Sequence, residues 1–340
     1  MEHITNRRGK NSLAIFLFFS ITIGSINAQG QQAETKSTPK QMVDALHAVF
    51  GKHPNARAVH AKGIILEGNF TPSAEAKTIT KAKHLQSGTI PVIVRFSDFT
   101  GIPDIPDTIG AANPRGFAIK FLMPDQTSTD IVAHSFNGFP VATTDEFREL
   151  LTSIAESQHA TSPTPLDQFL GTHPIAKTFF TTQKPAPVSY ATISYFGVNS
   201  FKLTNAKGDS EYIRYQFIPE SGEKFLTKQQ LLNSGPDYLQ KEIKERVAKM
   251  PVKIRFYAQI ATAGDKIANP SIAWSDKNKR VFLGTITINR LNTNTLKDDK
   301  NLSFIPNNLV DGIEAADPML TDRSKAYPIS VKERRENIQN

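Results

Sequence analysis

Short apolar runs separated by turn residues are the feature that most constrains the fold of this 340-residue chain. Runs rich in Val, Ile and Phe lie at residues 58–67, 90–97, 116–122, 195–203, 211–218, 252–261 and 281–291. Runs of this length, bounded by Gly, Pro, Asn and Asp, are typical of β-strands. Many strands at irregular spacing, with helical segments between them, predict an α+β protein that is mostly β and built on a large antiparallel barrel.

Helical segments are indicated by apolar residues that recur every three or four positions. This spacing occurs at Gln41–Phe50, where Gly51 would end the helix, and at Thr143–Ser157. Residues 227–250 also have a helical pattern. Residues 160–190 are rich in Pro, Thr and Ala, so we expect a loop with short helices there. These segments are the predicted helical insertions of the barrel.

The N-terminus has the pattern of a cleavable secretory signal. A basic segment at residues 7–10 precedes an apolar stretch at Leu13–Ile23, and the small residue Ala28 follows. The alternative is a membrane anchor, but about a dozen apolar residues are too few to span a bilayer. We therefore expect residues 1–28 to be removed near Ala28, which would place the mature protein in the periplasm or outside the cell.

The rest of the chain divides into a leader and one domain. Residues 29–40 are polar with few apolar anchors, so we expect a flexible leader, and residues 41–340 are expected to form a single domain. The absence of cysteine excludes disulfides, zinc–thiolate sites and iron–sulfur clusters. The formal net charge is +8, and no basic stripe with interleaved aromatic residues is present. Nucleic-acid binding and membrane insertion are therefore not expected, whereas an anionic ligand would be compatible.

Five stretches stand out when the sequence is read as a whole, and most of the candidate functional residues lie in them. They are Arg57–Gly63 (RAVHAKG), Val94–Ser97 (VRFS) with Asn113–Phe121 (NPRGFAIKF), Phe201–Leu203 with Asn205–Gly208, Asn269–Trp274 (NPSIAW), and Gly312–Glu314 with Arg323–Pro328 (RSKAYP) and Arg334. The residues alone also allow plain structural interpretations. A histidine in an apolar strand is more often a core residue, and an Arg–Tyr–Arg stripe is more often a solvated helix face.

Together, and in this order, these stretches resemble the catalase family. The first is similar to the strand with the distal histidine, and the second to the RFS and PRGFA strands. The fifth is similar to the turn and helix with the proximal tyrosine. The resemblance covers roughly residues 45–340 and implies a catalase-type antiparallel barrel, a C-terminal helix with the haem ligand, and haem b as the cofactor.

The resemblance makes Tyr327 the iron ligand. A phenolate is a hard anionic donor that suits ferric iron. An ordinary tyrosine has a pKa of about 10, so a phenolate ligand needs a positive neighbour. Arg323 lies four residues before Tyr327, on the same face if the segment is helical, and can donate to the phenolate oxygen. Arg334 could reach a haem propionate. Pro328 disfavours helix at the residue before it, so the helix is expected to start at Tyr327 or to be kinked there.

On the other side of the haem, the resemblance makes His60 the residue that moves a proton between the two peroxide oxygens. An imidazole suits this work near neutral pH. Ser97 would hydrogen-bond the far ring nitrogen of His60. Arg57 and Arg95 match the family's propionate-binding arginines, although two surface salt bridges would also explain them.

The chain departs from the family pattern in two places. The family's distal asparagine lies in a segment that corresponds to residues 130–140, which is longer here, so Asn137 is the candidate for that role and His134 an alternative. The printed sequence ends 13 residues after Tyr327, without the regions that follow the ligand in full-length catalases. We therefore expect an open haem edge and a monomer or small homo-oligomer.

These features resemble the small catalase-related peroxidases. The predicted function is reduction of hydrogen peroxide or organic hydroperoxides with a small organic electron donor, with weak or no catalase activity. The alternatives are a true catalase, an exported haem-binding protein without turnover, and a hydroperoxide-rearranging enzyme on the same scaffold.

Overall fold

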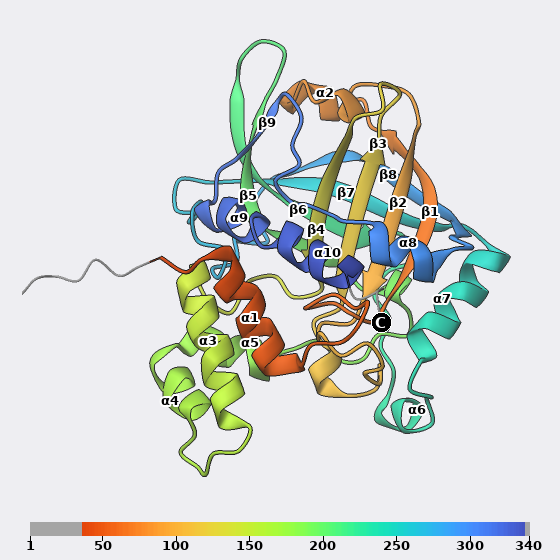
Figure 1. Cartoon of the computed structure of the whole chain (residues 1–340). Coiled ribbons are helices and arrows are strands. Elements are labelled where there is room, and N and C mark those ends of the chain that lie inside the picture. The colour runs from red at the N-terminus through yellow and green to blue at the C-terminus, as the bar shows by residue number, and fades with distance from the viewer. Residues whose placement is uncertain (1–35, 337–340) are drawn as a thin grey trace, which may run out of the picture. The chain divides into compact units, whose positions relative to one another are not determined.

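The computed structural model, which describes residues 36–336, is built on antiparallel strands that close into a barrel (Figure 1). The strands are β1 (Gly63–Pro72), β2 (Ile90–Ser97), β3 (Gly116–Leu122), β4 (Ser128–His134), β5 (Tyr195–Thr204), β6 (Ser210–Pro219), β7 (Val252–Ile260), β8 (Arg280–Leu291) and β9 (Ile313–Ala315). Their order is β4-β3-β2-β1-β8-β7-β6-β5, and the pairing of β4 with β5 closes the ring of eight. β9 adds to β5. The predicted antiparallel barrel with helical parts is confirmed.

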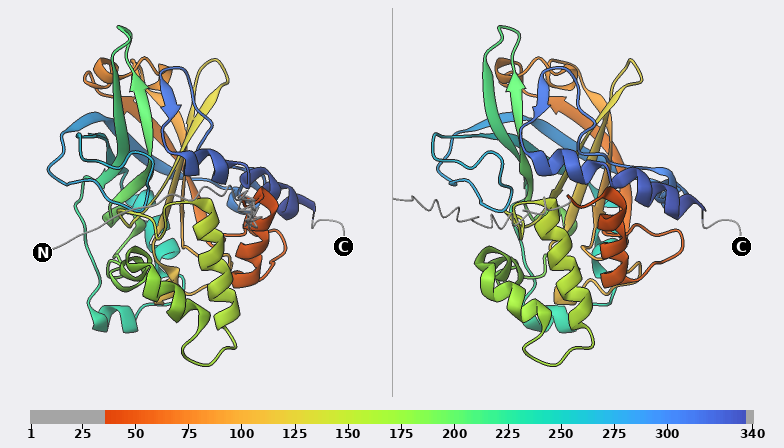
Figure 2. Two further views of the ribbon diagram at one scale, coloured as in Figure 1. Left: turned by 90° about the vertical axis from the view of Figure 1, so that its left-hand side faces the viewer. Right: turned by 60° about the vertical axis from the view of Figure 1, so that its left-hand side comes forward.

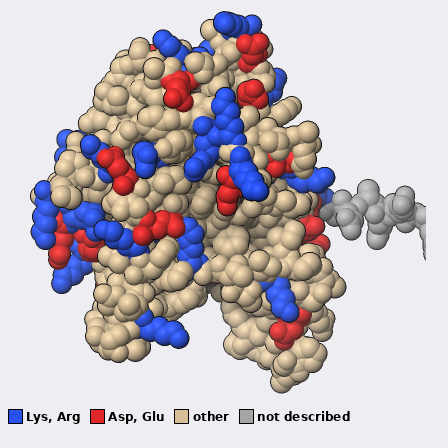
Figure 3. Space-filling model, turned by 180° about the vertical axis from the view of Figure 1, so that it is seen from behind, with Lys and Arg blue, Asp and Glu red and all other residues tan. Residues whose placement is uncertain are grey.

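Helices lie at both ends of the barrel, with α2 at one end and most of the others toward the other end (Figure 1). They are α1 (Pro39–Phe50), α2 (Ala76–Ile79), α3 (Thr144–Ser157), α4 (Pro165–Thr172), α5 (Pro174–Thr181), α6 (Lys228–Leu232), α7 (Tyr238–Lys249), α8 (Thr295–Asn301), α9 (Pro318–Ser324) and α10 (Tyr327–Glu336). α1 packs against α3, and both lie below the C-terminal helices in the two views of Figure 2. On the face seen in Figure 3, basic and acidic side chains are interspersed. No helix among residues 36–336 is long and apolar enough to cross a membrane.

Aromatic side chains fill the interior of the barrel. The largest fully buried ones are Phe70, Phe96, Phe117, Phe121, Phe217, Phe256, Tyr190, Tyr195 and Tyr215. Several rings touch directly; those of Phe217 and Phe256 stack with centroids 4.7 Å apart. Ring pairs of this kind contribute roughly 0.5–1.5 kcal/mol beyond the area that they bury. The barrel is therefore a solid core, and any large cavity must lie outside it.

The strand predicted for residues 58–67 begins later, at Gly63. His60 has φ +56°, a left-handed conformation that no strand contains. Its N–H donates to the carbonyl of Phe99 at 2.9 Å, and the N–H of Ala61 donates to the carbonyl of Thr100 at 2.8 Å. These bonds fasten the segment to the loop after β2 rather than to a sheet. His60 therefore lies on a loop just before β1, and the prediction of a histidine within a strand is wrong.

The long helix predicted for residues 227–250 is two helices, α6 and α7. Gly235 and Pro236 lie between them, and both residue types disfavour a helix interior. Asp107 stabilises this break through two hydrogen bonds. Its N–H donates to the carbonyl of Pro236 at 2.7 Å, and its carboxylate accepts from the N–H of Leu239 at 2.8 Å.

The strand β4 was not predicted from the sequence.

The predicted signal at residues 1–28 lies outside the described residues, as does most of the predicted leader at 29–40. The end of that leader is ordered. α1 begins at Pro39, and Thr38 caps it by accepting a hydrogen bond from the N–H of Gln41. The N–H of Ser37 donates to the carboxylate of Asp145 at 2.6 Å. The leader expected at residues 29–40 therefore overlaps the capped start of α1.

Candidate active site

A large cavity lies between the end of the barrel, α1, α3 and the C-terminal helices. The space not filled by protein atoms is about 1430 Å³, part of it open to solvent. The residues that line it extend from Met42 on α1 to Arg334 on α10, so the cavity runs along the whole space between these elements. Its walls are mostly apolar, and the polar side chains are few: Arg57, His60, Arg95, Ser97, His134, Thr144, Ser303, Arg323, Tyr327, Ser330 and Arg334. The cavity thus gathers every predicted site residue except Asn137.

His60 presents a free nitrogen lone pair to this cavity. Its Nδ1 lies 2.9 Å from the carbonyl oxygen of Asp98 and 3.1 Å from the Ser97 hydroxyl. A carbonyl can only accept a hydrogen bond, so Nδ1 must hold the proton and Nε2 is the unprotonated nitrogen. Burial, and secondarily the charge of Arg95, lowers the pKa of His60 to about 3. The ring is therefore neutral at physiological pH and can accept a proton.

Asp98 supports His60 through its main chain, a role that the sequence reasoning missed. Its carboxylate is fully buried and pairs with the guanidinium of Arg115, and it accepts a hydrogen bond from the Tyr190 hydroxyl at 3.0 Å. Burial raises the pKa of Asp98 above its ordinary value, although the charge of Arg115 opposes the rise. Because Arg115 and Tyr190 both hold the Asp98 side chain, the main-chain carbonyl of Asp98 that accepts from His60 is fixed in position.

Gly116 lets the two barrel strands come close to His60. It is the register partner of Ser97 on β2 and of His134 on β4, so the three positions lie side by side across the sheet. A β-carbon at position 116 would lie 2.3 Å from the Ser97 hydroxyl and 2.7 Å from Nδ1 of His60. Neither atom belongs to a flexible chain end. The close approach therefore requires glycine.

Replacement of Gly116 by alanine should displace His60 and Ser97. We expect a loss of roughly 1–3 kcal/mol in the free energy of unfolding, as for overpacking elsewhere, together with a loss of activity. Gly110→Ala is the matched control, because a β-carbon there meets nothing within 4 Å. Urea unfolding and peroxide turnover measure both effects. Equal behaviour of the two variants would contradict this geometry.

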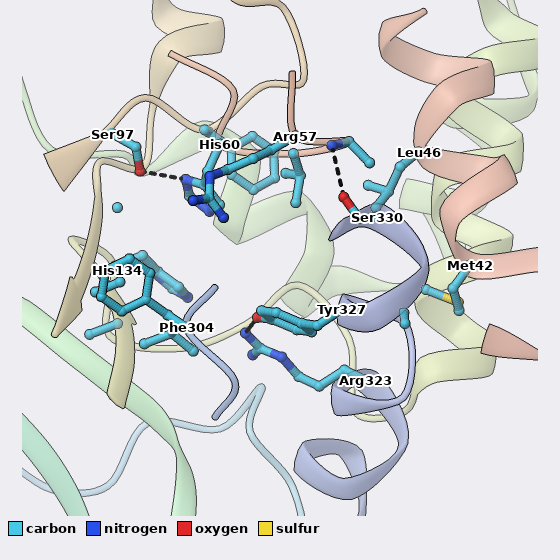
Figure 4. Close-up of a pocket in the computed structure, with 18 of the residues that line it drawn as sticks. Met42, Leu46, Arg57, His60, Ser97, His134, Phe304, Arg323, Tyr327 and Ser330 are labelled. Carbon is cyan, nitrogen blue, oxygen red and sulfur yellow. Dashed lines mark hydrogen bonds between the residues drawn. The ribbon is translucent and has the colours of Figure 1, made fainter. Parts of the chain in front are cut away.

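Tyr327 faces His60 from the opposite side of the cavity (Figure 4). It is the first residue of α10, which confirms the expected helix start before Pro328. Arg323, near the end of α9, donates from Nη2 to the Tyr327 hydroxyl oxygen at 2.8 Å and from Nη1 to Asn199 at 3.2 Å. A guanidinium that donates to a phenol oxygen stabilises negative charge there. The pair is therefore suited to bind a cation such as ferric iron through the phenolate.

The remaining arginines line one edge of the cavity. Arg57, Arg95 and Arg334 come from the loop before β1, from β2 and from α10, and all three contribute to its wall. Much of their hydrogen-bonding capacity is used by the protein itself. Arg334 donates to the carbonyls of Lys300 and Leu302 at 2.7 and 2.5 Å. Within residues 36–336, Nε of Arg57 is buried and has no hydrogen-bond partner, so a further acceptor would fit there.

The structure places His134, not Asn137, in the cavity wall. His134 ends β4 and pairs with Phe196 of β5 at the seam where the barrel closes. Its Nδ1 accepts from the N–H of Phe136 at 3.3 Å, so its Nε2 carries the proton. That nitrogen is buried, and the described part of the chain offers it no acceptor. Asn137 lies three residues beyond the strand and does not line the cavity.

These observations fit a haem. The walls are apolar, three arginines stand at one edge for its carboxylates, and a phenol beside a guanidinium faces an unprotonated imidazole nitrogen. Arg57 and His134 each bury a nitrogen that has no partner among the described residues, and an occupant of the cavity would satisfy these polar groups. Among residues 36–336, no cluster of three or more His, Asp or Glu side chains could hold a metal ion directly. Tyr327 would hold the iron, and the arginines the carboxylates.

Comparisons with known proteins agree with this geometry. The sequence model of the Catalase family matches residues 27–338. A catalase-related peroxidase of Mycolicibacterium paratuberculosis is 35% identical over 299 residues, which cover 87% of this chain and 94% of the relative. A catalase-related peroxidase of Synechococcus elongatus is 33% identical over 307 residues, or 89% and 90% of the two chains.

One crystal structure, of a fungal catalase, shares the fold with a TM-score of 0.75 at 22% identity. The match covers 85% of this chain but 62% of the fungal one, so the present sequence spans less than two thirds of that catalase.

Proposed function

The chain belongs to the catalase family and is an oxidoreductase that acts on peroxide, and we propose that it is a haem b peroxidase that uses a small organic electron donor. The observation that carries the proposal is the pairing of Tyr327, with Arg323 on its oxygen, and the unprotonated Nε2 of His60 on opposite sides of one apolar cavity. Haem would supply the redox chemistry, and this chain's residues would supply ligation and proton transfer.

His60 is proposed to handle the proton. Its Nε2 accepts the proton of the bound peroxide, because Nδ1 is already protonated and donates to Asp98. The same nitrogen would then give this proton to the second oxygen, which would leave as water, with the electrons for cleavage of the O–O bond supplied by the cofactor. Ser97 and the Asp98 carbonyl keep the ring in one orientation throughout. General acid–base catalysis of this kind contributes roughly 10²–10⁴-fold in rate.

We propose that His134 takes the place for which Asn137 was the sequence candidate. It is the register neighbour of Gly116, where an added β-carbon would meet His60, and its Nε2–H is a donor without an acceptor among the described residues. The Nε2–H of His134, beside the proton-accepting Nε2 of His60, would donate a hydrogen bond to the peroxide oxygen that has lost its proton.

Replacing His134 by leucine should therefore lower kcat/KM for hydrogen peroxide about tenfold, which corresponds to roughly 1.4 kcal/mol. His134→Gln is the matched variant, because its amide keeps an N–H at nearly the same reach, and it should retain most of the activity. Steady-state kinetics with the cofactor-loaded proteins measures this. If Asn137→Leu has the larger effect, the assignment of His134 is wrong.

The balance of activities is tested by two rates on the same sample. We expect fast oxidation of a phenolic dye by hydrogen peroxide and slow evolution of oxygen without the dye. The reason is that part of the cavity is open to solvent, which gives organic donors access to the proposed cofactor. Oxygen evolution that exceeds dye oxidation would favour a true catalase, and absence of both activities would favour a haem-binding protein. Rearranged products from a fatty-acid hydroperoxide would identify the remaining alternative.

We propose further that the protein is exported. The support is the basic, apolar and small-residue pattern of residues 1–28. Expression of the full chain should give a mature protein that starts after Ala28, which N-terminal sequencing measures. A cytosolic, uncleaved product would contradict this proposal.

A further inference from the structure

We propose that Asp299 is a positioning residue that holds the main chain of His60 in place through Arg95. The effect of Asp299 on turnover rests on the proposed function, in which His60 transfers the proton. Its effect on the main chain of His60 does not. Asp299 lies near the end of α8, which comes from a part of the sequence more than 200 residues away from His60.

The first step is a two-point ion pair. Arg95 donates from Nε to one carboxylate oxygen of Asp299 at 2.5 Å and from Nη2 to the other at 2.9 Å. Arg95 is only 3% exposed. Although burial alone would raise the pKa of Asp299, the charges of Arg95 and Arg57 hold it well below its ordinary value. Asp299 is therefore ionised, and the planar guanidinium is held in one orientation.

The second step joins Arg95 to the histidine loop. Its Nη1 donates to the carbonyl of His60 at 2.9 Å, and its Nη2 donates to the carbonyl of Ala61 at 3.1 Å. The guanidinium fits tightly under Gly63, where a β-carbon would lie 2.4 Å from Cζ of Arg95. His60 has the left-handed φ of +56°, a conformation that persists in a residue with a β-carbon only when its surroundings hold it. Arg95 supplies two of the bonds that do so.

The third step is the second arginine. Arg57 donates from Nη2 to the Asp299 carboxylate at 3.0 Å, so one carboxylate bridges two like charges. Burial, with the nearby charge of Arg95, lowers the pKa of Arg57 to about 10. Asp299 is not among the residues that line the cavity, whereas both arginines are. The carboxylate thus stands behind the arginines, as a support, and not in the place of a ligand.

This arrangement gives Arg95 a second role. A guanidinium has five N–H groups, and the bonds to Asp299, His60 and Ala61 use four of them. One N–H of Arg95 is left for a cofactor carboxylate. Beside that predicted binding, Arg95 has a structural task, which is to fix the backbone of the acid–base residue.

The test compares Asp299→Asn with Asp298→Asn. Asp298 is the adjacent carboxylate on α8, and it accepts from Asn292 rather than from an arginine. Hydrogen–deuterium exchange of the full chain should show amides in the segment 57–62 exchanging at least tenfold faster in Asp299→Asn, with β7 and β8 unchanged. In the haem-loaded proteins, kcat/KM for peroxide should fall at least tenfold while the haem absorption band is retained. Asp298→Asn should show neither effect.

The outcomes are separable. Unchanged exchange in the segment 57–62 of Asp299→Asn would overturn the inference, as would faster exchange spread equally over the whole barrel, since the latter is general destabilisation. Normal turnover despite faster local exchange would also overturn it. If the wild-type protein takes up no haem, the proposed function fails, but the exchange experiment still decides whether Asp299 holds this loop.

Discussion

Replacing His60 by alanine should lower kcat/KM for hydrogen peroxide by about 10²–10⁴-fold, while the protein still takes up its cofactor. The reason is the unprotonated Nε2, which is the proton acceptor over the proposed haem. Haem uptake should persist because Tyr327 and the edge arginines, not His60, would hold the group. Steady-state kinetics and the haem absorption band measure the two parts of this prediction.

The control for this variant is His159→Ala, which changes an exposed histidine away from the cavity. The pH profile adds a second check. The base works when neutral, and burial lowers its pKa to about 3, so kcat/KM should stay flat from pH 8 down to pH 5. A base with the ordinary pKa of about 6.5 would lose roughly thirtyfold at pH 5. A rate within a few fold of wild type in His60→Ala would remove His60 from the mechanism.

Replacing Arg115 by leucine should cost about 3–5 kcal/mol in the free energy of unfolding. Arg115 is fully buried, and its guanidinium pairs with Asp98 and donates to the carbonyl of Asp107 at 2.5 Å. Leucine would leave the Asp98 carboxylate in the interior without its cation. Because the carbonyl of Asp98 orients His60, we also expect a loss of activity in the protein that remains folded.

The loss of unfolding free energy in Arg115→Leu should depend on pH in a definite direction. Without Arg115, the pKa of Asp98 in the folded state should rise further above its unfolded value, so the folded state binds more protons. The stability deficit should then shrink as the pH falls from 8 to 5. Urea unfolding at several pH values measures it, with Arg290→Leu as control, because Arg290 pairs with Glu67 through a side chain that is 71% exposed. Such exposed pairs contribute roughly 0–1 kcal/mol. Equal deficits in the two variants would contradict the buried network.

Much of the fold could be predicted because strand signals are local. The bounds of β2 and β3 agree with the predicted runs, since Val, Ile and Phe alternate there between clear turn residues. β4 was missed because its first three residues, STD at 128–130, are polar and continue a polar stretch that includes Gln126. The break between α6 and α7 was overlooked although Gly235 and Pro236 indicate it.

The candidate site could be predicted only as far as its motifs reach. His60, Ser97, Tyr327 and Arg323 could be predicted because each lies in a recognisable stretch. The structure brings all four together around one cavity. The other residues of the site are defined by contacts between segments that are distant in the sequence. His134 enters the cavity because β4 pairs with β3 in one register, and no spacing in the sequence shows that register. Asp299 and Asp98 act through contacts with distant segments, for which local patterns carry no signal.

The central claim is that Tyr327 holds a haem opposite His60, and the absorption spectrum of the purified protein loaded with haem b tests it most directly. We predict a Soret band with the high-spin ferric features of a tyrosinate ligand, and its loss or marked change in Tyr327→Phe. A protein that binds no haem, or a Tyr327→Phe variant with the spectrum of the wild type, would contradict the claim.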